Sequence, residues 1–301
     1  MWQSLLNNII QGNFKALARA ISLVENEVEG YEQFLSELPN AQTAIIGITG
    51  PPGAGKSTLV DALIGHWTTK GKRIAVLCVD PSSPFNLGAL LGDRIRMTEW
   101  YTHPNVFIRS LASRGSLGGL HPHIIEITSL VQSANFDFII VETVGVGQSE
   151  IEIVGLADTT VVVVVPEAGD EVQTMKAGLM EIADLFVVNK SDRPDSDIFV
   201  RNLRSMLSQG THEQFETAVL KTVASAKVGI DELAAAIELH LQHITNSEKK
   251  IWLLTERVYQ LIQQKKMKGI EKETIRKSIA AQIHLPGFNL FNFANKYNDP
   301  S

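Results

Sequence analysis

A glycine-rich run that begins at residue 50 restricts the fold of this chain more than any other feature of its sequence. The run is Gly50-Pro51-Pro52-Gly53-Ala54-Gly55-Lys56-Ser57, followed by Thr58. It matches the pattern G-x-x-x-x-G-K-[ST], in which glycines allow backbone N–H groups to surround phosphate oxygens. We expect Lys56 to reach the β- and γ-phosphates of a nucleotide, and the hydroxyl of Ser57 to hold Mg²⁺. Residues 50–58 are therefore predicted to bind a nucleoside triphosphate.

The segments on either side of this run predict its structural context. Residues 44–48 are a short apolar run typical of a buried parallel strand, and residues 58–64 are expected to form a helix. The positive end of that helix would point at the bound phosphates. This order of strand, loop and helix predicts an α/β fold with a mostly parallel central sheet flanked by helices.

A second motif indicates which base the nucleotide carries. Residues 184–188 form another apolar run, and Asn189-Lys190-Ser191-Asp192 follows it directly. A carboxylate only accepts hydrogen bonds, so Asp192 can pair with the N1–H and the amine of guanine but not with the unprotonated ring nitrogen of adenine. Asn189 and Lys190 would brace the loop and cover the purine, which favours GTP and GDP over ATP. After the strand-like residues 219–223, a third loop would offer backbone N–H groups to the guanine oxygen from Ser225, Ala226 and Lys227.

Two carboxylates are predicted to lie near the γ-phosphate. Asp80 follows the apolar run 73–79, and Glu142 follows the run 136–141. Open parallel sheets bind ligands at the carboxyl ends of their strands, where both side chains could complete an oxygen shell around Mg²⁺. The N–H of Gly145 could contact the γ-phosphate. The alternative is that each carboxylate caps a helix that follows its strand.

The composition limits the classes of partner. A chain of 301 residues, 44 % of them hydrophobic, can bury one large α/β core. The net charge of −6 argues against nucleic acid or an anionic membrane as a partner. The longest apolar run, residues 161–165, ends at Pro166 and is too short to cross a bilayer. Since no signal peptide is recognisable, we expect a cytoplasmic protein without membrane insertion.

The sequence contains no recognisable cluster of cysteine and histidine residues that could bind a soft metal, and only two further arginines are candidates for binding phosphate. Cys78, the single cysteine, lies in the expected strand 73–79 and is predicted to be a core residue. His121 and His123 have no third ligand at a suitable spacing, so the start of a helix or a surface turn is expected there. Arg109 and Arg114 could stabilise phosphate charge, with a structural role as the alternative.

Both ends of the chain are predicted to be helical. Within residues 1–40, Leu17, Ile21 and Val24 have the spacing of one apolar helix face. A nucleotide-binding domain is expected at residues 41–245. Residues 246–301 contain two further amphipathic stretches that predict a helical hairpin, and its apolar face must be buried. It could pack on the core of its own chain or form a two-fold dimer interface.

A series of short motifs also follows the order of a known family. The matching residues are 16–26, 50–58, 79–85, 91–97, 116–119, 142–150, 169–171 and 189–192. On these motifs the chain resembles the MeaB-type GTPases, chaperones of cobalamin-dependent mutases that were also described as ArgK or as lysine/arginine/ornithine transport ATPases. The resemblance implies the P-loop NTPase fold, GTP or GDP and Mg²⁺ as ligands, and a homodimer formed through the C-terminal hairpin.

The resemblance also assigns roles to particular residues. It places Asp80, Asp93 and Glu142 around Mg²⁺ and the switch loops, and it implicates Gln173 and Lys176 in hydrolysis stimulated by a partner. No glutamine that could position water directly follows Gly145. We therefore expect slow intrinsic turnover, with Lys56 offsetting the charge of the transferred phosphoryl group.

Two function classes remain at this point. The resemblance implies a GTPase that binds an adenosylcobalamin-dependent acyl-CoA mutase, such as methylmalonyl-CoA mutase, gates the loading of its cofactor and protects it. The alternative is a nucleotide-hydrolysing kinase or energiser of lysine, arginine and ornithine transport. A kinase needs an acceptor pocket and a general base near the γ-phosphate, and the sequence contains no motif for either.

Overall fold

The structure of this chain is a computed structural model. The structure describes residues 1–80, 97–112, 120–143, 152–167, 179–208, 217–244, 248–270, 272–285 and 288–297. The chain divides into two compact units, Met1–Leu254 and Thr255–Ser301. The first contains the central sheet and the segments expected to bind nucleotide, and the second is helical in its described part. The expected domain limits at residues 41–245 remain a prediction.

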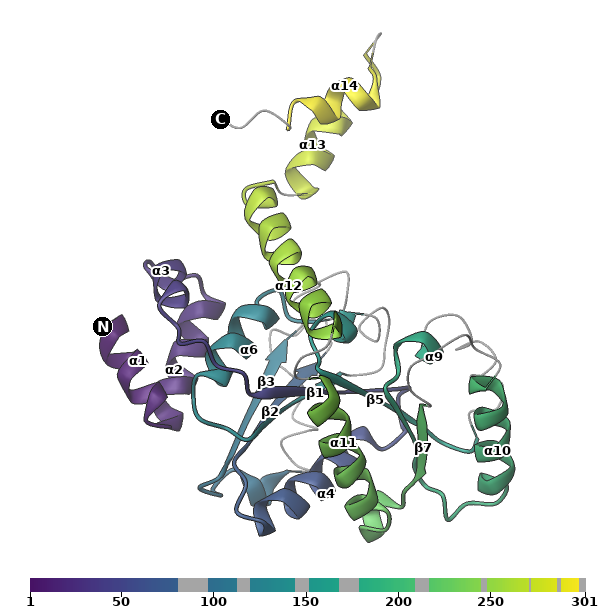
Figure 1. Ribbon diagram of the computed structural model, residues 1–301. Coiled ribbons are helices and arrows are strands. Elements are labelled where there is room, and N and C mark those ends of the chain that lie inside the picture. Colours follow the sequence, from purple (N-terminus) through teal and green to yellow (C-terminus); the bar gives the residue numbers. More distant parts are fainter. Residues whose placement is uncertain are drawn as a thin grey trace. The chain divides into compact units, whose positions relative to one another are not determined.

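A seven-stranded sheet forms the centre of the first unit (Figure 1). Its strands are β1 Ala44–Thr49, β2 Ile74–Asp80, β3 Val106–Ala112, β4 Phe138–Thr143, β5 Thr159–Val164, β6 Leu185–Val188 and β7 Ala218–Lys221. Their order is β3-β2-β4-β1-β5-β6-β7, and each neighbouring pair is parallel. The central strands are buried on both faces, which explains their continuous runs of valine and isoleucine. The predicted mostly parallel sheet is therefore confirmed.

Most of the strands lie where the apolar runs predict them, and β3 is the exception. The runs at residues 73–79, 136–141 and 161–165 correspond to β2, β4 and β5, with ends that differ by one to two residues. No strand was predicted at residues 106–112, because Arg109 and Ser110 interrupt the apolar pattern. Both residues lie in β3, which pairs along its whole length with β2.

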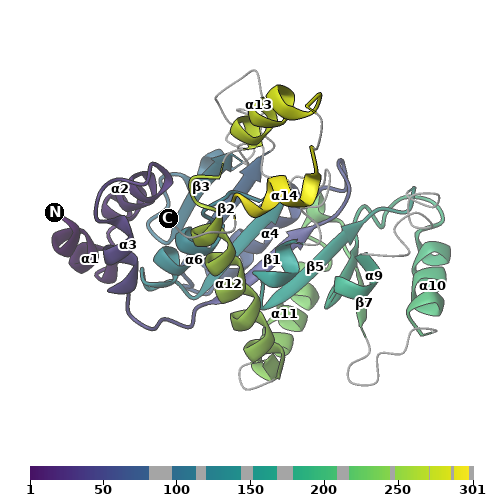
Figure 2. The same ribbon diagram turned by 90° about the horizontal axis from the view of Figure 1, so that it is seen from above.

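Helices cover the sheet and extend both ends of the chain. They are α1 Trp2–Ile10, α2 Phe14–Glu25, α3 Tyr31–Ser36, α4 Lys56–Thr69, α6 Ile124–Gln132, α9 Leu179–Ile182, α10 Ser196–Leu207, α11 Ile230–Ile244, α12 Glu248–Met267, α13 Lys272–Gln282 and α14 Leu290–Asn295, with short 3-10 turns η1 Thr98–Trp100, η2 Ile153–Gly155 and η4 Ala224–Ala226. Figures 1 and 2 show α4 and α11 side by side, α1 to α3 near α6 at the β3 edge, and α10 beside β7. None of the described helices is long and apolar enough to span a membrane.

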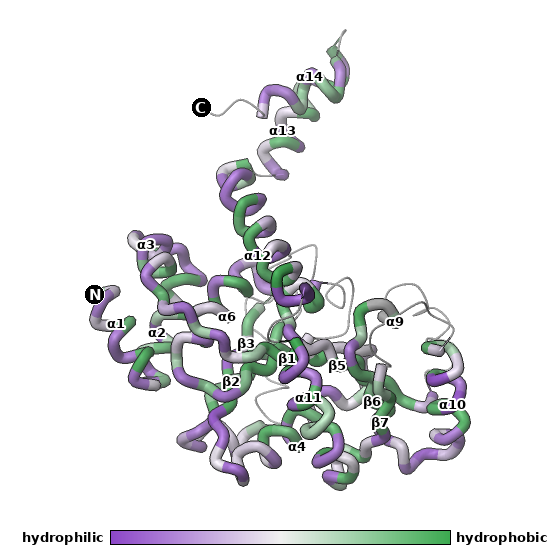
Figure 3. The backbone as a smooth tube through the Cα atoms, viewed as in Figure 1, coloured by the Kyte–Doolittle hydropathy of each residue, from purple (hydrophilic) through white to green (hydrophobic). Residues whose placement is uncertain are grey.

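The two sides of the first unit are held by different contacts. On the α4 side, one core cluster joins the strands to α4 and α11. The indole of Trp67 in α4 also donates to Glu238 Oε1 of α11 at 2.7 Å. On the other face, an added Cβ at Gly47 would lie 2.6 Å from Ile153 Cγ1, so this strand position needs glycine. Figure 3 shows the hydrophobic residues concentrated along the central strands.

The predicted helices at the chain ends are present. Leu17, Ile21 and Val24 are buried on one face of α2, as their spacing predicts. In the C-terminal region, α12 ends at Met267 and Gly269 takes a left-handed φ of 88°, which separates α12 from α13. Along α12, hydrophobic and hydrophilic residues alternate (Figure 3).

Two lysines attach the start of α12 to the amino ends of the strands. Lys249 lies 2.5 Å from Asp184 Oδ1, just before β6, and Lys250 lies 2.5 Å from Asp158 Oδ1, just before β5. The second oxygens of the two carboxylates accept the N–H groups of Thr160 and Ile45, each at 2.8 Å. These aspartates therefore fix both the strand starts and the first turn of α12.

We expect Asp184→Asn to destabilise the protein near neutral pH by roughly 1.5–3 kcal/mol, the usual value for hydrogen bonds to a charged group. Burial opposes ionisation of Asp184, but the hydrogen bond from His240 and the charge of Lys249 outweigh it, so the pKa lies below 3.8. A lowered pKa stabilises the fold above 3.8, and this contribution disappears as the pH falls through the folded-state value.

Urea unfolding of the wild type and of Asp184→Asn at several pH values tests this. The difference should shrink in acid. Asp197→Asn, which loses only an exposed ion pair with Lys221, should change the stability by less than about 1 kcal/mol. An equal difference at every pH would contradict the assigned role of the charge.

Candidate active site

The phosphate-binding loop connects β1 to α4 and needs glycine at two positions. Gly50 has a φ of 138°, and a Cβ there would lie 2.1 Å from the carbonyl oxygen of Val163 in β5. Gly55 has a φ of 88°, and its Cβ would lie 2.4 Å from Nδ2 of Asn189. Both positions combine a left-handed backbone with a close neighbour, so any side chain would displace the loop.

Lys56 and Ser57 are the first two residues of α4, which starts two residues earlier than predicted. Nζ of Lys56 donates to the carbonyl oxygens of Gly50 and Pro51 at 2.8 and 3.0 Å, and the residue is only 6 % exposed. The amine therefore lies across the loop whose N–H groups would bind phosphate. The position agrees with the predicted role of Lys56.

The side chains of Ser57 and Glu142 meet between α4 and β4. Ser57 Oγ donates to Glu142 Oε1 at 2.6 Å, and both residues are buried. Hydroxyl and carboxylate oxygens are the ligands that Mg²⁺ prefers, so this pair fits the expected ion. The alternative in which Glu142 merely caps a following helix does not explain its bond to the phosphate loop.

Asp80 ends β2, the strand next to β4. Cys78 is in register with Glu142, so Asp80 lies two residues further along the neighbouring strand, at the same edge of the sheet. Cys78 itself is buried in the core, as predicted. The structure describes the backbone of Asp80 but not its side chain. Four further predicted residues lie entirely outside the described part of the chain, namely Asp93, Gly145, Gln173 and Lys176. Their predicted roles remain predictions.

We expect Glu142→Gln to raise the Mg²⁺ concentration needed for half-maximal GTP hydrolysis by about 10-fold. The amide is neutral and is a weaker ligand for a hard cation than a carboxylate. Titration of the hydrolysis rate with Mg²⁺ measures the effect, and Glu142→Asp, which keeps the charge, should be affected less. An unchanged Mg²⁺ requirement in Glu142→Gln would exclude this residue from the ion's environment.

Asn189 joins the predicted base loop to two other segments. Its Nδ2 donates to the carbonyl oxygen of Ala54 at 2.9 Å. Its Oδ1 accepts the hydroxyl of Thr222 and the N–H of Ala224, both at 3.1 Å. Since Asn189 is 2 % exposed, these bonds are shielded from water. The structure thus brings the phosphate loop and both predicted base loops together.

The residues expected to contact guanine lie around this junction. Lys190 has a φ of 55°, and its Nζ donates to the carbonyl oxygen of Gly53 at 2.7 Å. The N–H of Ser191 donates to the carbonyl oxygen of Thr222 at 3.0 Å, which holds the segment before Asp192 beside the third loop. Four of the residues predicted to bind the base are exposed at this junction, where a base could reach them, namely Asp192, Ser225, Ala226 and Lys227.

Other candidates lie elsewhere or were not predicted. Arg109 contacts Glu25 rather than the phosphate loop, which supports its structural alternative, while Arg114 lies outside the described residues. His121 is buried, and residues 122–123 form a partly exposed turn just before α6 begins at Ile124, so both expectations for this segment, a turn and a helix start, agree with the structure. No motif indicated the role of Thr222, which is fully buried and donates to Asn189 across 33 positions of the chain.

These features together define a P-loop nucleotide hydrolase. The profile of the family described as Methylmalonyl Co-A mutase-associated GTPase MeaB matches residues 17–281, so the chain belongs to this family and is a GTPase. A protein of Pyrococcus abyssi with the name Putative GTPase is 44 % identical over 279 residues, which cover 91 % of this chain and 82 % of that protein. GTPase ArgK of Escherichia coli is 36 % identical over 281 residues, with coverages of 89 % and 82 %.

A solved structure has the same architecture over nearly the whole chain. It is described as a LAO/AO transport system kinase, and it superimposes with a TM-score of 0.67 at 25 % identity. The superposition covers 99 % of this chain and 96 % of that one. The expected family and P-loop NTPase fold are therefore confirmed.

Proposed function

We propose that this GTPase is a chaperone of an adenosylcobalamin-dependent acyl-CoA mutase, most directly methylmalonyl-CoA mutase. It would gate the loading of the cofactor and protect the mutase. The observation that carries the proposal is the extent of the family match, from residue 17 to residue 281. That range includes most of α2 and reaches into α13, helices that a nucleotide site alone does not need.

In the proposed mechanism, hydrolysis depends on positioning and charge. Lys56 and the N–H groups of the phosphate loop would stabilise charge on the γ-phosphoryl group as water attacks. Mg²⁺, when bound, would neutralise charge on the phosphate oxygens, and Ser57 and Glu142, whose side chains meet at 2.6 Å, would hold it. The partner would raise a slow basal rate by acting on residues 169–176, including Gln173 and Lys176.

We also propose that a second copy of the chain covers an apolar face of α12. Val258, Tyr259 and Ile262 are 54, 57 and 49 % exposed, and their spacing places them on one side of the helix. A two-fold interface buries the same residues on both copies. The homodimer and the cytoplasmic location both remain predictions.

The proposed function is tested by measuring GTP hydrolysis by the purified chain, alone and with the adenosylcobalamin-dependent mutase of the same organism. We expect a slow basal rate that rises when the mutase is added, and a smaller rise for Lys176→Ala or Gln173→Ala. A rate that is indifferent to the mutase would refute the chaperone role and leave the GTPase. Transfer of the γ-phosphate to an acceptor other than water would instead support the transport-kinase alternative.

A further inference from the structure

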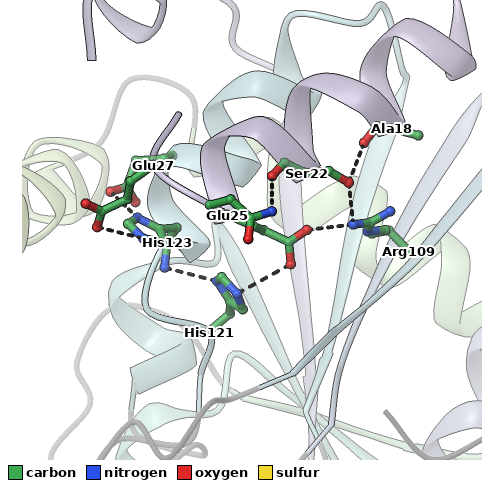
Figure 4. A network of polar contacts seen from close by, with 9 residues as sticks. Ala18, Ser22, Glu25, Glu27, Arg109, His121 and His123 are labelled. Atoms are coloured by element: carbon green, nitrogen blue, oxygen red, sulfur yellow. Dashed lines mark hydrogen bonds and ion pairs between the residues drawn. The ribbon is translucent and has the colours of Figure 1, made fainter. Parts of the chain in front are cut away.

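Glu25, the last residue of α2, contacts one residue within β3 and one residue just before α6 (Figure 4). Its Oε2 lies 2.6 Å from Nη2 of Arg109 in β3. Its Oε1 lies 3.5 Å from Nε2 of His121, which precedes α6. Arg109 Nη2 also donates to Ser22 Oγ of α2 at 3.0 Å. One carboxylate of an N-terminal helix thus joins two residues of the nucleotide-binding domain that are 12 positions apart in the sequence.

The surroundings of these groups strengthen the contacts. The side chains of Glu25 and Arg109 are 10 and 29 % exposed, and that of His121 is fully buried. His121 Nδ1 accepts the N–H of His123 at 3.1 Å, which assigns the proton of a neutral ring to Nε2, the nitrogen that faces Glu25. Opposite charges and hydrogen bonds interact more strongly here than on an open surface.

The register of the sheet places this contact near the predicted Mg²⁺ site. Arg109 is in register with Leu77 of β2, and Ala112, the last residue of β3, is in register with Asp80. The held arginine therefore lies three residues before the end of the strand that flanks Asp80. A shift of this end of β3 would move the backbone that pairs with β2 next to a predicted Mg²⁺ ligand.

We propose that Glu25 is a positioning residue for GTP hydrolysis. By holding Arg109 and His121 together, it fixes the carboxyl end of β3 and, through the β2 pairing, the backbone of Asp80. The N-terminal helices are then part of the catalytic framework and not only a cover for the β3 edge. The inference rests on the proposed hydrolysis mechanism, in which Asp80 lies close to Mg²⁺, and it does not depend on the mutase.

Glu25→Gln in the full-length chain tests the proposal. The amide is nearly isosteric but removes the negative charge that faces Arg109. We expect kcat for basal GTP hydrolysis to fall about 10-fold, below the ~100-fold loss that a full 1 Å misplacement can cause. The KM for GTP and the Kd for GDP should stay within about 2-fold, because the phosphate and base loops are untouched. Glu29→Gln, an exposed carboxylate four residues further on, should match the wild type.

A second variant tests the contact between Glu25 and His121. It also keeps the proposal testable if Glu25→Gln does not fold. His121→Asn can keep an acceptor for the N–H of His123 but removes the nitrogen that faces Glu25. We expect it to lower kcat in the same direction, again with GDP affinity preserved. Wild-type kcat in both variants would overturn the proposal, and so would a loss of GDP affinity as large as the loss of kcat. A wild-type protein that does not hydrolyse GTP would instead refute the proposed mechanism itself.

Discussion

Lys56→Ala is expected to reduce GTP hydrolysis by about 1,000-fold or more. Loss of one preorganised donor to a transition-state oxyanion costs ~100- to 1,000-fold in kcat, and Lys56 supplies a full positive charge in a nearly buried position. In the structure its amine bridges the carbonyl oxygens of Gly50 and Pro51 across the phosphate loop. Alanine would remove both this bridge and the charge that is predicted to face the γ-phosphate.

Single-turnover hydrolysis of GTP measures this effect without interference from product release. Lys70→Ala is the matched control, because Lys70 is exposed and lies just beyond the other end of α4. It should hydrolyse GTP at the wild-type rate. Near-normal turnover by a folded Lys56→Ala protein would refute the role of Lys56, whatever its effect on nucleotide affinity.

Asp192→Asn is expected to weaken GTP binding by about 100-fold. Two hydrogen bonds from guanine to a carboxylate are each worth roughly 1.5–3 kcal/mol. The amide of asparagine is neutral and has only one oxygen that accepts, so it cannot replace both bonds. Xanthine has a carbonyl where guanine has its exocyclic amine, so the N–H₂ of asparagine can donate to it. The variant should therefore bind xanthosine triphosphate better than the wild type does.

Competition between the two nucleotides for the wild type and the variant measures this exchange. Asp195→Asn provides the control, since Asp195 is also exposed, lies three residues further on and has a left-handed φ of 63° that asparagine tolerates. It should leave both affinities unchanged. An unaltered preference for guanine in Asp192→Asn would show that another group reads the base.

The glycine motif and the apolar runs predicted the phosphate loop and most strands of the sheet, because each pattern reflects a physical requirement of the segment that carries it. The phosphate loop is recognisable from its glycines, and Gly50 and Gly55 do occupy left-handed conformations beside close neighbours. The apolar runs predict strands because a parallel sheet covered on both faces excludes water from every strand residue. β3 escaped prediction because Arg109 lies in an edge strand and binds Glu25 of a distant helix.

The contacts that assemble the site could not be read from the sequence. Asn189 was expected to brace its loop, but its bonds to Ala54 and Thr222 depend on the packing of segments 135 and 33 positions away. The same holds for Glu142, whose pattern suggested a Mg²⁺ ligand without showing that it meets Ser57. Such long-range pairs follow from strand order, which no short motif encodes.

The assignment of this site as a guanine-specific nucleotide hydrolase site is tested by comparing GTP and ATP hydrolysis by the purified protein in the presence of Mg²⁺. The Lys56→Ala variant serves as the blank. We predict slow turnover of GTP, with kcat/KM at least ~100-fold above that for ATP, because adenine cannot supply the two hydrogen bonds that Asp192 is expected to accept. The blank should show neither activity. Equal turnover of both nucleotides, or activity that survives in the blank, would contradict the site described here.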